Sequence, residues 1–259
     1  MSQLLKTPNN SEIDLENIKE DEHLLHLWEP LSFTIDENFE YVHKGFFFSI
    51  FSNLLYLIAL PILWVIDKLF FGFRIIGREN FNKVKGGKIT VSNHVHMMDC
   101  TMVGLCNFPD KTFFISLASN FKIPIVRTLI KLLNAIPIPE NYCCKKNFKK
   151  AINNLLKEGG CVHIYPEGSL WAYYNKIRNF KDGAFSFAVD NKVPIIPLTF
   201  SFYKPESLYK LFKKKPCIEL EVLEPVYPNY NLPRCEAIKD LKNKVHENMI
   251  KNIESKKAI

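Results

Sequence analysis

The chain has 259 residues, of which 47% are hydrophobic and 24% charged, which predicts a globular core and excludes a low-complexity or fully disordered chain. The net charge of +7 is unevenly spread, because residues 1–44 hold ten acidic and three basic side chains (−7) and the remainder holds 17 acidic and 31 basic ones (+14). A basic body attracts anionic partners, but no zinc-finger spacing or basic stretch interleaved with aromatic residues points to nucleic acid, so we expect no nucleic-acid partner.

The first 44 residues predict an acidic N-terminal arm, weakly ordered, with a short helix around Leu24. This polar start lacks the basic and apolar regions of a secretory signal, so we expect none. The seven cysteines, an odd number, show no metal-ligand spacing. We therefore expect free thiols in a reducing cytosol and no metal site.

Residues 46–66 form an uncharged apolar run of the length that a membrane-spanning helix needs, inside a membrane-anchoring segment that we place at 45–72. Pro61 lies within the run, and apolar residues resume at 69–71 after Asp67 and Lys68. These features favour a kinked helix or a helical hairpin that dips into one leaflet, with a true span or a buried core helix as alternatives. Three basic residues, Lys68, Arg74 and Arg78, follow the run, which predicts attachment to the cell membrane with the body on its cytoplasmic face.

From residue 73 onwards, apolar alternation and helical periodicity take turns along the chain, so 73–259 is expected to form the main domain. The strongest helical signal lies at 145–158, where apolar residues recur at helical spacing and two glycines follow. Strands that alternate with helices predict an α/β fold, a mixed sheet flanked by helices. The expected strands are 73–76, 88–91, 112–117, 135–138, 161–165, 193–202 and 218–222, and the further helices are 99–105, 124–133, 182–191 and 235–253.

A histidine and a carboxylate five positions apart, His94 and Asp99, follow the strand expected at 88–91. In a regular helix this spacing would put the two side chains about 140° apart, so they meet only if the chain leaves helical geometry between them. If they meet, Asp99 sets the tautomer of the imidazole and leaves its other nitrogen to act as a base.

Three further blocks accompany this pair, namely Tyr165-Pro166-Glu167-Gly168-Ser169, the stretch 180–185, and the Val-Pro-Ile-Ile-Pro of 193–197. In this order and at these distances, from about Phe73 to Phe202, they resemble the glycerolipid acyltransferases, the lysophosphatidic acid acyltransferase family. The resemblance implies phospholipid biosynthesis, with His94 and Asp99 as the catalytic pair that activates an acceptor hydroxyl. It also implies that Asn93, Glu167, Gly168 and Ser169 help to bind the acceptor. Salt bridging or helix capping is the alternative role for Glu167, and holding the loop is the alternative role for Asn93.

The same resemblance implies an acyl thioester, on coenzyme A or on acyl carrier protein, as co-substrate and no permanently bound cofactor. The expected partners are a lipid bilayer and a lysophospholipid, with 1-acyl-glycerol-3-phosphate as the best single acceptor and phosphatidic acid as its product. This chain has Glu140 and Leu170 where the family usually has phosphate-gripping arginines. Lys145, Lys146, Arg178 and Lys181 are the candidate substitutes, although a solvated basic face would also explain them. A head-grouped lysophospholipid therefore remains an alternative acceptor.

Two other classes of function remain as alternatives. A non-catalytic membrane-binding module would explain the missing arginines. A metallohydrolase would explain the pair His94 and His96 followed by Asp99, although the spacing is off by one and Cys100 stands where the final histidine would be.

Overall fold

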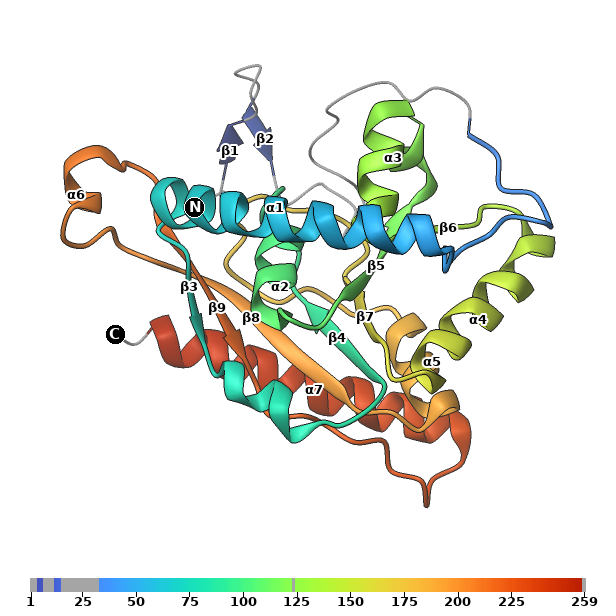
Figure 1. The fold of residues 1–259 in the computed structure, drawn as a ribbon. Helices are drawn as coiled ribbons and strands as arrows, with labels where there is room; N and C mark the ends of the chain where they lie inside the picture. Colours follow the sequence, from blue (N-terminus) through green and yellow to red (C-terminus); the bar gives the residue numbers. More distant parts are fainter. Residues whose placement is uncertain (1–3, 7–11, 15–32, 123, 258–259) are drawn as a thin grey trace.

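A seven-stranded mixed sheet forms the centre of the computed structural model, which describes residues 4–6, 12–14, 33–122 and 124–257 (Figure 1). The strand order is β3-β9-β8-β4-β7-β5-β6. The five strands from β8 to β6 run parallel, whereas β9 is antiparallel to β8 and pairs in parallel with β3. The strands are β3 (Arg74–Ile76), β4 (Lys88–Ser92), β5 (Thr112–Leu117), β6 (Ala135–Ile138), β7 (Cys161–Ile164), β8 (Ile195–Tyr203) and β9 (Cys217–Val222).

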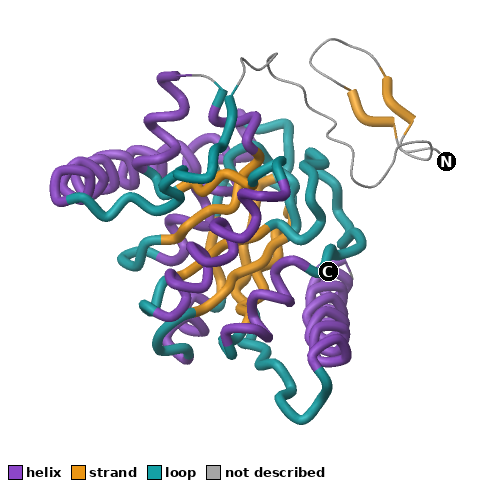
Figure 2. The backbone as a smooth tube through the Cα atoms, turned by 90° about the vertical axis from the view of Figure 1, so that its right-hand side faces the viewer, coloured by secondary structure: helices purple, strands orange, loops and turns teal. Residues whose placement is uncertain are grey.

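Helices cover both faces of this sheet, as the turned view shows (Figure 2). Because successive strand residues point to opposite faces, Ile195 joins the apolar cluster under α4, α5 and α7, while Ile196 joins the cluster that contains Met102 of α2. The helices are α1 (Phe46–Phe71), α2 (Asp99–Asn107), α3 (Pro124–Leu132), α4 (Tyr142–Lys157), α5 (Gly183–Asn191), α6 (Tyr209–Phe212) and α7 (Arg234–Lys257). Among the described residues, 3-10 helices occupy Arg78–Lys83 and Ala118–Phe121, and a separate two-stranded sheet pairs β1 (Leu4–Lys6) antiparallel to β2 (Glu12–Asp14). The predicted mixed α/β sheet with flanking helices is confirmed.

The apolar segment forms one continuous helix, α1, which passes through Pro61 and ends at Phe71. The alternative of a helical hairpin is therefore wrong. Asp67 lies within this helix, and its buried side chain accepts a hydrogen bond from the Thr101 hydroxyl at 3.2 Å. Gly72 adopts a left-handed conformation (φ 59°) and caps the last turn. By length and composition α1 is able to cross a membrane, and 11% of its most apolar window is buried.

Strand β9 differs from expectation in its environment. The alternation of Glu219 and Glu221 predicts one solvated face. In the structure α7 covers that face, and Lys256 forms ion pairs with both carboxylates. Arg74 forms a second ion pair with Glu219. Burial by itself would raise the pKa of Glu219, but the charges of Lys256 and Arg74 outweigh it, so the pKa is lowered.

Most expected elements are present with boundaries shifted by a few residues, and α6 and the 3-10 helices were not predicted. The helix expected around Leu24 lies outside the described residues. The division into an arm (1–44), an anchoring segment (45–72) and a main domain (73–259) stays a prediction, although α1 falls within the second of these ranges.

Candidate active site

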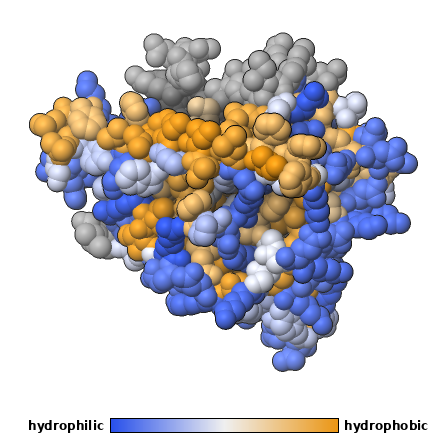
Figure 3. Space-filling model, viewed as in Figure 1, coloured by the Kyte–Doolittle hydropathy of each residue, from blue (hydrophilic) through white to orange (hydrophobic). Residues whose placement is uncertain are grey.

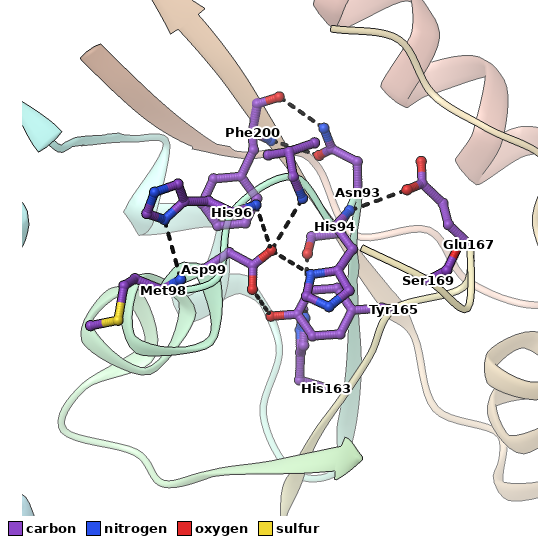
Figure 4. Close-up of polar contacts among 12 residues, drawn as sticks. Asn93, His94, His96, Met98, Asp99, His163, Tyr165, Glu167, Ser169 and Phe200 are labelled. Atoms are coloured by element: carbon purple, nitrogen blue, oxygen red, sulfur yellow. Dashed lines mark hydrogen bonds and ion pairs between the residues drawn. The ribbon is translucent and has the colours of Figure 1, made fainter. Parts of the chain in front are cut away.

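The loop between β4 and α2 brings His94 and Asp99 together at the carboxyl end of β4 (Figure 4). His94 Nδ1 lies 2.6 Å from Asp99 Oδ2, and the backbone N–H groups of Val95 and His96 donate to the same oxygen at 3.3 and 3.4 Å. The loop thus wraps around a buried carboxylate, and the chain does leave helical geometry between the two residues. The side chain of His94 remains 20% exposed, so that solvent reaches the imidazole while Asp99 stays buried.

Tyr165, which follows β7, completes the surroundings of this pair. Its hydroxyl donates to Asp99 Oδ1 at 2.6 Å, and its ring stacks on the His94 imidazole with centroids 3.9 Å apart. Burial, helped by the nearby charge of Asp99, raises the pKa of Tyr165 well above its usual value. The phenol therefore stays protonated and donates to the carboxylate throughout the physiological range.

His163 lies beneath Tyr165 and is fully buried. Its Nδ1 is 2.8 Å from the Thr90 hydroxyl and its Nε2 is 3.3 Å from that of Ser92. Burial lowers the pKa of His163 to about 3, so the ring is neutral at neutral pH. A neutral ring with both nitrogens engaged is suited to supporting Tyr165 and the end of β4.

Asn93 was expected to help bind substrate, but the structure buries it completely. Its amide oxygen accepts from the N–H of Phe200 at 2.8 Å, and its amide nitrogen donates to the carbonyl of Phe200 at 2.9 Å. Asn93 thereby joins the start of the His94 loop to β8. This arrangement supports a positioning role rather than substrate contact.

Glu167 and Arg178 form a buried ion pair behind the His94 loop, with side chains 1% and 3% exposed. Arg178 Nη2 donates to Glu167 Oε2 at 2.8 Å, and the same oxygen accepts from the backbone N–H of His94 at 3.2 Å. The guanidinium also bonds Ser169 and lies over the Trp171 ring. Glu167 thus forms the salt bridge that was its alternative role, and Arg178 is turned inward onto it. Acceptor binding by Glu167 and phosphate binding by Arg178 stay predictions.

The turn that follows Glu167 is shaped by Gly168, whose φ of 81° lies in the left-handed region that favours glycine. Its N–H donates to the Tyr165 carbonyl at 3.1 Å and closes the turn. Ser169 is buried, and its hydroxyl accepts from Arg178 at 2.7 Å. Like Asn93, Ser169 supports the site from behind rather than facing an acceptor.

Lys145 and Lys146 are exposed on the first turns of α4, which follows β6. Strand β6 is the third strand from β4, so about 14 Å of sheet separates their origins at roughly 4.8 Å per strand. The structure thus does not bring these lysines beside His94, and their role as phosphate ligands stays a prediction.

The two imidazoles of the His94-Val95-His96 stretch point in different directions (Figure 4). The His96 ring packs against Phe71 of α1 at 4.6 Å between centroids, and its Nδ1 accepts from the N–H of Met98 at 3.2 Å. Within the described ranges, no group of three or more His, Cys, Asp or Glu side chains is placed to hold a metal ion. The divergence of the two rings argues against the metallohydrolase alternative.

Tyr165 and His163 were missed as site residues, although the sequence held a signal for them. They are two positions apart at the end of a predicted strand, so they point to the same face. The register that pairs β7 with β4, with His163 opposite Thr90, sets that face beside the His94 loop. The sequence alone did not show that β7 lies next to β4, and this adjacency is what brings the two residues to the site.

Comparison with known proteins places these features in a family. The family model described as Acyltransferase matches residues 72–201, which include His94, Asp99, Tyr165, Glu167 and Arg178. A 1-acyl-sn-glycerol-3-phosphate acyltransferase of Chlamydomonas reinhardtii is 34% identical over 133 residues, which is 50% of this chain and 39% of that protein. A chloroplastic 1-acyl-sn-glycerol-3-phosphate acyltransferase of Arabidopsis thaliana is 30% identical over 50% of this chain and 36% of its own length. The match thus spans well under half the length of these curated relatives.

Among solved structures, the 1-acyl-sn-glycerophosphate acyltransferase of Thermotoga maritima aligns with a TM-score of 0.45 and 20% identity. The alignment covers 79% of this chain and 95% of that one.

Proposed function

Because this chain belongs to the acyltransferase family, we propose that it moves a fatty acyl group from an acyl thioester to the hydroxyl of a lysophospholipid. The observation that carries this proposal is the 2.6 Å contact between His94 Nδ1 and Asp99 Oδ2 inside the matched segment. An ionised Asp99 makes Nδ1 the donor, which leaves Nε2 to accept a proton. A free alcohol is a poor nucleophile at neutral pH, so a base in this position supplies what the transfer requires.

In the proposed reaction, the acceptor hydroxyl attacks the thioester carbonyl carbon while His94 Nε2 takes the hydroxyl proton. The carbonyl oxygen becomes a tetrahedral oxyanion, and its collapse forms the new ester and breaks the carbon–sulfur bond. The thiolate then leaves and receives the proton from the imidazolium, which restores the neutral base. Asp99 stabilises the imidazolium between these steps, and the Tyr165 hydroxyl holds Asp99 by donating to its other carboxylate oxygen, Oδ1.

We propose 1-acyl-glycerol-3-phosphate as the acceptor, which makes phosphatidic acid the product and phospholipid biosynthesis the process. The similarity to proteins named 1-acyl-sn-glycerol-3-phosphate acyltransferase supports this choice. Coenzyme A and acyl carrier protein both carry the acyl group as a thioester, so either one fits the proposed reaction. A head-grouped lysophospholipid is the alternative acceptor, favoured by Glu140 and Leu170 where the resembled family places arginines.

The proposal is tested with the purified full-length protein, both donor types and a panel of lysolipids. We expect thioester-dependent formation of phosphatidic acid, with lysophosphatidate used at a higher kcat/KM than lysophosphatidylcholine or lysophosphatidylethanolamine. A reversed preference would overturn the choice of acceptor while leaving the acyl transfer in place. Failure of every donor and acceptor pair with folded protein would favour the non-catalytic membrane module.

We further propose that α1 anchors the protein to a bilayer. Its surface carries large exposed apolar side chains, which Figure 3 shows as an orange band along the helix. Such a patch is unusually large for a soluble monomer. Washing membranes with high salt or alkaline carbonate should leave the protein bound, whereas release by salt alone would show that binding is electrostatic. The cytoplasmic face of the cell membrane stays a prediction, and two of the basic residues behind it, Arg74 and Arg78, are occupied within the protein.

A further inference from the structure

The connection between β8 and β9, residues 204–216, carries an exposed apolar tip. Leu208 is 72% exposed, Leu211 82% and Phe212 63%, on and beside the single-turn helix α6. Three large apolar side chains in one short projection cost free energy in water and indicate a surface that is covered in use. We refer to residues 204–216 as the α6 projection.

The α6 projection is attached to the C-terminal end of α1. The hydroxyl of Tyr209 donates to the carbonyl of Lys68 at 2.5 Å, and that of Tyr203 donates to the carbonyl of Gly72. Cys217, where β9 begins, packs so closely on Gly72 that a Cβ at position 72 would clash with its sulfur. In Figure 1, α6 lies beyond the end of α1, and in Figure 3 the apolar band of α1 continues toward that side.

The α6 projection is also strongly basic. It contains five lysines (204, 210, 213, 214 and 215) and one acid, Glu206, so its net charge is +4. Lys204, Lys210, Lys214 and Lys215 are exposed. Lysines around an apolar tip suit a surface that is negatively charged outside and apolar inside, because their stems extend along apolar surface while the ammonium groups stay at the charged layer.

The α6 projection lies on the His96 side of the candidate active site. Lys215 Nζ is 5.3 Å from the centre of the Tyr173 ring, which in turn contacts the His96 ring at 5.5 Å. The pKa of His96 is lowered mainly by burial, with Asp99 opposing and the charges of Lys215 and Lys213 contributing. A surface that binds the α6 projection therefore lies close to the candidate active site.

We propose that the α6 projection is a second membrane-binding element, which inserts Leu208, Leu211 and Phe212 into the headgroup boundary of an anionic bilayer. Its positive charge suits an anionic bilayer and an acidic protein such as a carrier alike, whereas its exposed apolar tip and its continuity with α1 favour the lipid surface. This inference rests on the proposed anchoring by α1. With α1 and the adjoining α6 projection both bound to the bilayer, the protein has two attachment points. These fix the orientation of the site toward the lipid that supplies its acceptor.

The test measures backbone hydrogen exchange in the full-length protein bound to vesicles of phosphatidylcholine with 30% phosphatidylglycerol, and in detergent micelles. We expect amides of 208–213 to exchange at least roughly tenfold more slowly on the vesicles.

Leu211→Ser/Phe212→Ser should remove this protection while α1 stays protected. Lys210→Glu/Lys214→Glu should weaken binding to the anionic vesicles by roughly 30-fold or more, since each lysine near such a surface contributes substantially. The matched control Lys239→Glu/Lys251→Glu, on exposed positions of α7, changes the net charge equally and should leave binding unchanged.

Equal exchange of 208–213 on vesicles and in micelles, with α1 protected, would overturn the proposal and leave α1 as the anchor. Protection by acyl carrier protein but not by vesicles would also overturn it and identify an acidic protein as the occupant. An equal loss of binding in the α7 control would show that only net charge matters, which again contradicts the proposal. Acyl transfer by the wild-type protein to micellar substrate tests the proposed function separately, so the two failures are distinguishable.

Discussion

The hydroxyl of Tyr165 lies 2.6 Å from Oδ1 of Asp99, the carboxylate oxygen that His94 does not use. One buried carboxylate is thus held between a neutral donor and the candidate base. We expect Tyr165→Phe to lower kcat by roughly tenfold with little change in KM, because a hydrogen bond to a charged group contributes about 1.5–3 kcal/mol. Steady-state kinetics and thermal unfolding check this. An unchanged kcat would show that Tyr165 acts only through packing.

His94→Ala should lower the rate of acyl transfer by roughly 10²–10⁴-fold, because the acceptor hydroxyl loses its base. Asp99→Asn should also impair turnover severely, since the amide no longer holds Nδ1 as the donor. His96→Ala is the matched control, because this neighbouring ring points toward Phe71 rather than Asp99, and it should retain most activity. Near-normal turnover in folded His94→Ala would refute the mechanism.

Arg178→Ala should destabilise the protein by about 3–5 kcal/mol, because it leaves the buried carboxylate of Glu167 without its cation. The matched control is Arg234→Ala, which removes an exposed pair with Asp190 and should cost less than about 1 kcal/mol. Chemical denaturation measures both. A stable Arg178→Ala protein with a raised KM for lysophosphatidate alone would instead restore the phosphate-binding role predicted from the sequence.

The buried His163 should make stability depend on pH. Its pKa is about 3 in the folded chain and near 6.5 when solvated, so between these values the unfolded chain binds the additional proton. Stability is therefore fully present above pH 6.5 and falls as the pH drops toward 3. Between pH 6.5 and 5 this group accounts for a loss of about 2 kcal/mol. Denaturation midpoints at several pH values check this, and His163→Gln should show a shallower loss over that window. Equal slopes in both proteins would contradict the assignment.

Features encoded in short stretches of chain were predictable. The apolar periodicity of α4 identified that helix, because one face of an isolated segment already shows what it buries. The meeting of His94 and Asp99 was also predictable, because their spacing after a strand leaves a tight turn as the way for them to touch. The resemblance of the ordered motifs then identified the family that the comparison confirms.

Features that depend on which distant segments pack together were decided only by the tertiary structure. The sequence shows Glu167 and Arg178 as two polar residues eleven positions apart, and only the fold buries them together against the backbone of His94. Likewise, Glu219 reads as solvated until α7 brings Lys256 over β9. The physical reason is that the charge and periodicity of a residue are local properties. Its burial, its partner and hence its role depend on strand order and layer packing, which bring together parts of the chain that share no local signal.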